Sequence, residues 1–369
     1  MAQIIASSPR ADGFRMPAEF EPHAGTWMLW PQRTDNWRKA AKPAQEAFAV
    51  VARTIAQCEP VTVGANPDQV SHARQMLPGG VRVVEIANND AWMRDCGPSF
   101  VVDDKGSVRG IDWDFNAWGG LVNGLYFPWD LDQAVAQKVL KIEGVDLYKA
   151  PLVLEGGSIH VDGQGTCLTT EECLLSPGRN PGLTRDEIES CLQEYLSVDK
   201  VLWIPRGVFN DETSGHVDNL VCFIRPGVVA LTWTEDRSDP QYERSLEALE
   251  WLSSATDACG RRLDIHKIHQ PNPVLIRPEE AEEVDAVAGT LPRCSGDRLA
   301  ASYINFYFCN GGLIVPTFDD PNDYPALETL QCLIPERKVV GLPAREILLG
   351  GGNIHCITQQ QPVAETRLI

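Results

Sequence analysis

The sequence is short of positive charge. It carries 32 Lys and Arg residues against 51 Asp and Glu residues, which gives a formal net charge of −19. A negative field repels nucleic acid and anionic membrane surfaces, and it attracts cations. We therefore expect a small cationic molecule as the partner of this chain, and neither nucleic acid nor a membrane.

Paired cysteines and long apolar runs are also missing. The eleven cysteines are an odd number and none of them form a C-x-x-C pair, which argues against a disulfide framework and against a structural zinc site. No apolar run approaches the length of a membrane span, and the N-terminus does not combine positive charge with an apolar stretch as a secretory leader does. These absences predict a cytoplasmic protein with reduced thiols.

The chain has no recognisable linker either. No Pro-, Gly- or Ser-rich segment, charge block or low-complexity run divides its 369 residues. A chain of this length can bury a large core. We expect a mobile N-terminal tail over residues 1–12 and a single catalytic domain over residues 13–369.

What the sequence does contain is a set of glycine-rich segments that also hold acids, histidine or cysteine. They span residues 89–98, 154–163, 210–219 and 349–358. In the last segment three consecutive glycines precede Cys356, and glycines leave no side chain to block a ligand from a thiol. One such segment alone is typical of a surface turn. Four together indicate a shared site with Cys356 as a candidate nucleophile.

Strand pairs alternate with helical stretches along the chain. The expected pairs are 100–102 with 108–113, 158–161 with 166–169, 217–224 with 228–232, and 303–308 with 313–315. The expected helices are 44–57, 131–142, 184–195, 241–258 and 278–288. The pattern Leu-x-Gly-Gly-x-Ile-His occurs both at Leu154 and at Leu349. This order predicts a cyclic array of strand-helix units whose equivalent turns meet at one mouth of a central channel.

Five runs of residues resemble one known family. They are Asn-Asp-Ala-Trp-Met-Arg-Asp (89–95), Phe-Asn-Ala-Trp-Gly-Gly (115–120), Leu-Glu-Gly-Gly-Ser-Ile-His-Val-Asp-Gly (154–163), Gly-His-Val-Asp-Asn (215–219) and Gly-Gly-Gly-Asn-Ile-His-Cys-Ile-Thr-Gln-Gln-Gln-Pro (350–362). These runs are similar to those of the agmatine deiminases, also called agmatine iminohydrolases, and the likeness extends from about Gly13 to Pro362.

The resemblance implies a fold and an activity. The fold is the pentein fold of the guanidine-modifying superfamily, a pseudo-symmetric α/β propeller of five blades with the active site in its central channel. The activity is hydrolysis of agmatine to N-carbamoylputrescine and ammonia through a covalent cysteine thiouronium intermediate, without a cofactor or a metal. We expect a role in polyamine (putrescine) biosynthesis or agmatine catabolism, and a homo-oligomer with a dimer favoured.

The resemblance also implies roles for five residues. Cys356 would attack the guanidinium carbon, which resists attack unless its charge is held by carboxylates. That clamp would be Asp95 and Asp218. His216 would donate a proton and then act as a base, with Glu155 near it to favour the imidazolium. The spacing of His216 and Asp218 predicts that both lie on the same face of a strand.

Further residues are candidates for binding the substrate. Trp92 is expected to stack on the planar guanidinium, and Gly352 to leave room beside Cys356. Asp211 and Glu212 are candidates for the distal ammonium of agmatine. An enzyme for free arginine would need a basic residue for the α-carboxylate, and we expect no basic residue of the motifs to neutralise that carboxylate.

Three other functions are compatible with these residues. The pairs His160/Asp162 and His216/Asp218, with His355 and Cys356, would be the ligands of a metallohydrolase, although the helical His-x-x-x-His spacing is absent. A polyamine-binding protein would use the acids without any chemistry. An amidinotransferase would share the fold and the thiol intermediate but would transfer the group to an amine.

Overall fold

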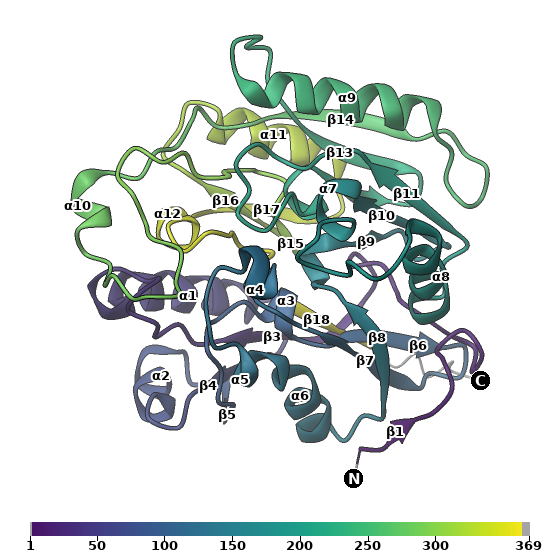
Figure 1. The fold of residues 1–369 in the computed structure, drawn as a ribbon, viewed down its shortest axis with the longest axis horizontal. Coiled ribbons are helices and arrows are strands. Elements are labelled where there is room, and N and C mark those ends of the chain that lie inside the picture. The colour runs from purple at the N-terminus through teal and green to yellow at the C-terminus, as the bar shows by residue number, and fades with distance from the viewer. Residues whose placement is uncertain (1, 364–369) are drawn as a thin grey trace.

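The computed structural model describes residues 2–363, and within them the strands form five separate sheets (Figure 1). Long helices lie at the periphery of the view in Figure 1, among them α1 (Lys42–Ile55), α6 (Val135–Glu143), α8 (Arg185–Leu196) and α9 (Pro240–Ser254). The sheets lie inside this layer of helices, so the architecture is mixed α/β.

One unit recurs in the sheets: an antiparallel strand pair, a helix, and a third strand parallel to the second. In one copy β12 (Val221–Arg225) and β13 (Val228–Trp233) are followed by α9 and β14 (Asp264–His269). In the next, β15 (Tyr307–Cys309) and β16 (Gly312–Thr317) are followed by α11 (Asp323–Leu333) and β17 (Lys338–Pro343).

The other three sheets contain the same unit. The strands β9 (His160–Val161) and β10 (Thr166–Thr170) precede α8 and β11 (Lys200–Ile204). The strands β6 (Ser99–Asp103) and β7 (Val108–Asp114) precede α6 and β8 (Leu147–Val153), with β1 (Ile4–Ile5) and β2 (Phe14–Arg15) at the sheet edges.

The fifth unit is built from both ends of the chain. β18 (Gln359–Pro362) pairs antiparallel with β3 (His23–Leu29), which is followed by α1 and the parallel strand β4 (Val61–Ala65). The helix α2 (Val70–Met76) and β5 (Arg82–Glu85) extend this sheet. Five copies of one unit agree with the five blades expected from the sequence.

The helices form where the sequence supplies a cap and an apolar face. Thr184 caps α8: its hydroxyl accepts from the Glu187 amide while the Glu187 carboxylate accepts from the Thr184 amide. Ile188, Leu192 and Leu196 follow at a spacing of four residues and are buried against the sheets.

All four predicted hairpins are present, and in three of them the first strand is shorter than predicted. Residues 217–219 form the short 3₁₀ helix η3 (Val217–Asn219), and β12 begins only at Val221. The prediction that His216 and Asp218 share the face of a strand is therefore wrong. The reason is that the chain makes a helical turn here before it enters the sheet. The Thr232 hydroxyl donates to the carbonyl of Asn219, the last residue of that turn.

Two helix predictions also need correction. The helix expected at 131–142 is divided into α5 (Asp130–Gln133) and α6. The helix expected at 278–288 is only α10 (Pro278–Ala281), because residues 282–288 bury too little apolar surface to extend it.

The N-terminal residues lie against the body of the protein. β1 pairs parallel with β8, and the Arg10 guanidinium donates to the carbonyl of Val198 at 2.7 Å. The division into a tail and a single domain after residue 12 stays a prediction. Among residues 2–363 no helix combines the length and the apolar character needed to cross a membrane.

Candidate active site

The candidate residues occupy equivalent turns, each directly before the first strand of a unit. Asp95 lies in α3 (Met93–Cys96) before β6, and Glu155 precedes η2 (Gly156–Ser158) and β9. His216 and Asp218 lie at η3 before β12, and Cys356 lies before β18. The turn before β15 supplies Asn305, which the sequence analysis did not identify. Residues far apart in sequence meet because their units are equivalent.

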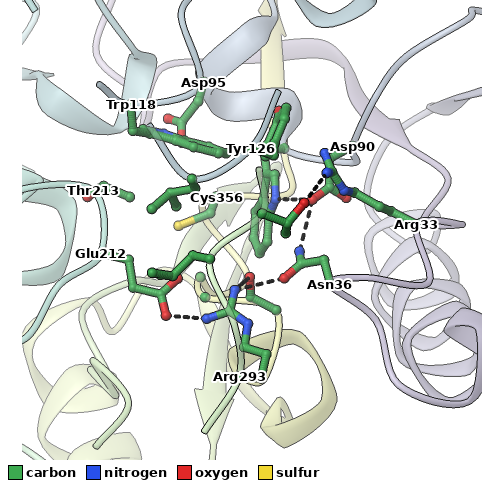
Figure 2. Close-up of a pocket in the computed structure, with 17 residues that line it drawn as sticks. Arg33, Asn36, Asp90, Asp95, Trp118, Tyr126, Glu212, Thr213, Arg293 and Cys356 are labelled. Atoms are coloured by element: carbon green, nitrogen blue, oxygen red, sulfur yellow. Dashed lines mark hydrogen bonds and ion pairs between the residues drawn. The ribbon is translucent and has the colours of Figure 1, made fainter. Parts of the chain in front are cut away.

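Cys356 lies in a pocket with about 440 Å³ of space between atoms, part of it open to solvent. Figure 2 shows its sulfur between Asp95 and Trp118 on one side and Glu212 and Arg293 on the other. The thiol is 4% exposed, and Sγ lies 3.4 Å from Asn305 Oδ1 and 3.8 Å from Asp218 Oδ2. Burial, together with the charges of Asp218 and Asp95, raises the pKa of the thiol well above its usual value. Without a bound cation, Cys356 is therefore a neutral thiol at neutral pH.

Asp95 is held by two donors. Its Oδ2 accepts from Trp118 Nε1 at 2.9 Å, and its Oδ1 accepts from the Gly157 amide at 2.9 Å. Burial raises the pKa of Asp95 to about 6, and the nearby charges of Asp218 and Glu155 act in the same direction. A cation bound beside Asp95 would favour its ionised form and so lower this pKa.

Asp218 presents one bonded and one free oxygen. Its Oδ2 accepts from His355 Nδ1 at 2.7 Å, whereas Oδ1 has no hydrogen-bond partner among residues 2–363. Burial opposes the charge on this carboxylate, but the bond to His355 keeps its pKa below the usual value. A buried and unsatisfied carboxylate oxygen is a strong acceptor for a ligand donor.

His216 lies between two acids. Its Nδ1 is 4.0 Å from Asp95 Oδ1, and its Nε2 is 3.4 Å from Glu155 Oε2. Burial opposes a charge on the ring, but Asp95, Cys173 and Glu155 raise the pKa of His216 well above its usual value. The geometry thus favours an imidazolium.

Glu155 has a buried cationic partner that the motifs did not reveal. Arg179 Nε lies 2.8 Å from Glu155 Oε1, and another nitrogen of Arg179 donates to the carbonyl of Thr213 at 2.6 Å. Burial raises the pKa of Glu155, but Arg179 and His216 lower it further, so that the net shift is downward. Glu155 remains ionised beside His216.

Position 157, in the motif of residues 154–163, has room only for glycine. A Cβ added there would lie 2.5 Å from His216 Nδ1, 2.9 Å from Asp95 Oδ1 and 3.0 Å from Asp218 Oδ2. Asp95, Asp218 and His216 therefore surround the backbone at Gly157, where no side chain fits.

Trp92 and Gly352 both line the pocket. A Cβ at Gly352 would lie 2.5 Å from the Trp92 ring and 3.1 Å from Cys356 Sγ, so glycine keeps the space beside the thiol open. Trp92 stacks on Trp37 with centroids 5.2 Å apart and donates through Nε1 to Asp90 at 3.0 Å. Its orientation is therefore fixed before a ligand arrives.

The two acids before the His216 motif have different positions. Glu212 lines the pocket; Oε1 pairs with Arg293, and Oε2 finds no hydrogen-bond partner in the described part of the chain. Asp211 is not among the residues that line the pocket. It accepts from the Thr213 amide at 3.0 Å and from the His216 amide at 3.1 Å. Asp211 therefore shapes the loop that carries His216, because local amides satisfy its carboxylate.

Trp118 is a pocket residue that the sequence analysis quoted but did not select. Ala117 and Trp118 have φ values of 54° and 63°, a conformation uncommon for residues with side chains. This strained turn places the Trp118 ring nearly perpendicular to Trp92, at an interplanar angle of 80°. The two consecutive glycines after Trp118 were the available signal for an unusual turn.

Two arginines from outside the motifs, Arg33 and Arg293, line the pocket. Arg293 donates to Asn36 Oδ1 at 2.7 Å and to the carbonyl of Gly350 at 2.6 Å, besides its ion pair with Glu212 (Figure 2). Arg33 pairs with Asp35 at 2.7 Å and lies over the Tyr126 ring. Neither arginine lies in a recognised motif, and each already has an acidic partner, Glu212 for Arg293 and Asp35 for Arg33.

The metallohydrolase ligand set is only partly brought together. The possible ligand atoms of Glu19, His160 and His355 lie within 4.8 Å of one another, as do those of Glu155, Cys173 and His216. Asp162 instead accepts from the amides of Gln164 and Thr166, both at 2.8 Å, within its own turn. Among the described residues, neither cluster includes Cys356 or Asp162.

Comparison with known proteins agrees with this geometry. The model of the Porphyromonas-type peptidyl-arginine deiminase family matches residues 15–362. A protein of Latilactobacillus sakei is 61% identical over 361 residues, which cover 98% of this chain and 99% of that protein. The agmatine deiminase of Pseudomonas aeruginosa strain UCBPP-PA14 is 58% identical over 358 residues, which cover 96% of this chain and 97% of that protein.

A solved structure of the agmatine deiminase of Enterococcus faecalis superposes with a TM-score of 0.97 at 53% sequence identity, covering 99% of this chain and 100% of that one. The predicted fold class, an α/β fold of the pentein type, is thereby confirmed, and so is the family expected from the motifs. The chain belongs to the agmatine deiminases, within the Porphyromonas-type peptidyl-arginine deiminase family.

Proposed function

We propose that this chain hydrolyses agmatine to N-carbamoylputrescine and ammonia, with Cys356 as the nucleophile. The observation that supports this most is the position of the thiol, buried at the pocket beside two clamp acids, with one Asp218 oxygen unsatisfied. The names of the relatives point to the same substrate.

In the proposed complex the guanidinium lies between Asp95 and Asp218. Its N–H groups donate to these carboxylates, and the free Oδ1 of Asp218 gains the partner that it lacks. The aromatic ring of Trp92 lies against the substrate, with Gly352 leaving room beside the thiol. The distal ammonium binds the free Oε2 of Glu212.

Binding of the cation activates the nucleophile. The positive charge offsets Asp95 and Asp218, the same acids that raise the pKa of the Cys356 thiol, so the thiol releases its proton more readily to the solvent to which part of the pocket is open. The thiolate adds to the guanidinium carbon. His216, as an imidazolium, then donates a proton to one NH₂ group, ammonia leaves, and the thiouronium remains on Cys356.

The second step uses the neutral form of His216. A water molecule gives one proton to His216 and adds to the thiouronium carbon. Collapse of this adduct forms the urea carbonyl and expels Cys356, whose sulfur takes the remaining hydroxyl proton and becomes a thiol again. Glu155, held by Arg179, stabilises the imidazolium that forms again. The same histidine thus serves as acid and base in turn.

The wider setting is part of this proposal. The product is one hydrolytic step from putrescine, which suits polyamine biosynthesis or agmatine catabolism in the cytoplasm. We propose a homo-oligomer with a dimer favoured, no nucleic-acid or membrane partner, and no cofactor. The net charge of −19 supports the first two absences.

The direct test is product analysis. Purified protein incubated with agmatine should release one ammonia for each N-carbamoylputrescine formed, as measured by an ammonia assay and mass spectrometry. Activity should survive dialysis against a chelator, whereas loss of activity that zinc restores would favour the metallohydrolase. Binding of agmatine without any ammonia would leave only a polyamine-binding protein, and consumption of an added amine would identify an amidinotransferase.

The pH dependence of binding provides a second test. A carboxylate whose pKa is raised to about 6 is ionised above that pH and becomes neutral as the pH falls through it, so Asp95 stops holding the guanidinium on the acid side. Agmatine affinity, measured by calorimetry on Cys356→Ser, should weaken about tenfold for each pH unit below about 6. An affinity that stays constant down to about pH 4.5 would remove Asp95 from the clamp.

A further inference from the structure

A buried chain of charged groups extends behind Asp218, away from the pocket that holds Cys356. His355 lies between two carboxylates: Nδ1 is 2.7 Å from Asp218 Oδ2, and Nε2 is 2.7 Å from Glu19 Oε2. His355, Asp218 and Glu19 are all less than 5% exposed. Neither Glu19 nor His355 has a role in the reaction proposed above.

Glu19 is itself fixed as an anion. Arg94 donates to its Oε2 at 3.0 Å, and the Phe308 amide donates to its Oε1 at 2.9 Å. Arg94 also donates to the carbonyl of His355 at 3.3 Å and to Gln360 at 2.8 Å. Hydrogen bonds from a guanidinium and an amide stabilise the ionised form of a carboxylate, so Glu19 is deprotonated.

The protonation state of His355 follows from these partners. A neutral imidazole donates through one nitrogen only, so its second nitrogen would direct a lone pair at a carboxylate 2.7 Å away. An imidazolium donates through both nitrogens and satisfies both acids. Burial and Arg94 act against this charge, but Glu19 and Asp218 outweigh them and raise the pKa of His355.

The neighbouring His160 is in the opposite state. Its ring stacks on His355 with centroids 6.2 Å apart, and its Nδ1 accepts from the Phe223 amide at 3.3 Å. Burial lowers the pKa of His160 to about 4. The single positive charge of this histidine pair therefore lies on the ring that contacts Asp218.

We propose that His355, held as an imidazolium between Glu19 and Asp218, is a positioning residue for the reaction at Cys356. Its bond to Oδ2 fixes the Asp218 carboxylate and leaves Oδ1 without a hydrogen-bond partner among residues 2–363, available to a ligand. Its charge also offsets the anion that lies 3.8 Å from the sulfur, where a thiolate must form. Glu19 keeps the imidazolium charged, and Arg94 keeps Glu19 in place. This inference rests on the proposed function of Cys356 and Asp218.

Glu19→Gln is the test variant, since it removes one of the two anions that hold the His355 charge. His355 should then lose its proton within the assay range as the pH rises. The value of kcat should fall at least about tenfold relative to the unmodified enzyme at about pH 9, but less than about threefold at about pH 6.5. KM for agmatine should not rise, because a pocket that has lost a positive charge still attracts a cation.

The chain offers a matched control in a second buried His–Glu pair. Glu59 lies just before β4 and accepts at 3.0 Å from Nδ1 of His23, the first residue of β3. Glu59→Gln should alter stability without moving the pH profile. His355→Gln, which has no ionisable group, should show the low kcat of Glu19→Gln at about pH 9 across the whole range, and the double variant should be no slower.

Two results would overturn the inference. One is a Glu19→Gln profile that runs parallel to that of the unmodified enzyme while Cys356→Ser is inactive, which would leave the proposed function standing and reduce Glu19 to a structural residue. The other comes from ¹⁵N NMR of histidine-labelled enzyme and needs no variant of Glu19. The His355 signals are assigned by their loss in His355→Gln, and we expect them to show two protonated ring nitrogens at about pH 8. A neutral ring at that pH would contradict the proposal.

Discussion

Cys356→Ser should reduce ammonia release from agmatine by at least about 10⁴-fold, because a serine hydroxyl in the same place remains protonated and is a far weaker nucleophile than a thiolate. The proposed clamp of Asp95 and Asp218 does not involve the sulfur, so agmatine should still bind with an affinity within about tenfold of the KM of the unmodified enzyme. Ammonia assay and calorimetry on the same preparation measure the two quantities.

Cys167→Ser is a suitable control for this experiment. Cys167 is as buried as Cys356, but it lies in β10 and its thiol faces the backbone carbonyl of Leu168 at 3.5 Å. This variant should remain active. If Cys356→Ser kept full activity, the assignment of the nucleophile would be lost, and with it the covalent intermediate.

Agmatine should be preferred over arginine by at least about 10³-fold in kcat/KM. The two substrates share the guanidinium and differ at the far end, where arginine adds a carboxylate. At the pocket that carboxylate would meet Glu212, whose Oε2 is unpartnered among residues 2–363. Arg293 offsets this only in part, since both of its terminal nitrogens already donate to Glu212, Asn36 and Gly350 and only Nε has no partner among residues 2–363. Like charges in a desolvated site cost several kcal/mol, and 1.4 kcal/mol corresponds to a factor of ten.

Glu212→Gln and Asp211→Asn form a matched pair for this prediction. Both remove one carboxylate from neighbouring positions, but only Glu212 lines the pocket. Glu212→Gln should narrow the preference by at least about tenfold, whereas Asp211→Asn should change rates without changing the ratio of the two substrates. Equal rates on agmatine and arginine in the unmodified enzyme would refute the proposed preference for agmatine and leave the thiol mechanism intact.

Much of the architecture could be read from the chain itself. Short-range signals are responsible: the turns with Gly, Asn or Pro between apolar strands predicted the four hairpins, and capping residues such as Thr184 predicted helix starts. The parallel third strand of each unit was not predicted, because parallel pairing joins segments separated by a whole helix and leaves no local pattern.

The same division holds within the site. Glycines beside acids, histidine and cysteine identified Asp95, Glu155, His216, Asp218 and Cys356, and the structure brings these five together. No local signal distinguished Glu212 from Asp211, since both are acids in one loop and only the packing of that loop decides which side chain faces the pocket.

The sequence by itself determined which residue types are available for chemistry on a cationic guanidine, and in which turns they lie. Only the tertiary structure decided their partners and charges. Arg179, Asn305 and Glu19 reach the site from turns and units remote in sequence, and burial beside such partners raises or lowers each pKa. The physical reason is that backbone turns are local, whereas the electrostatic environment of a buried group is the sum of everything that packs around it.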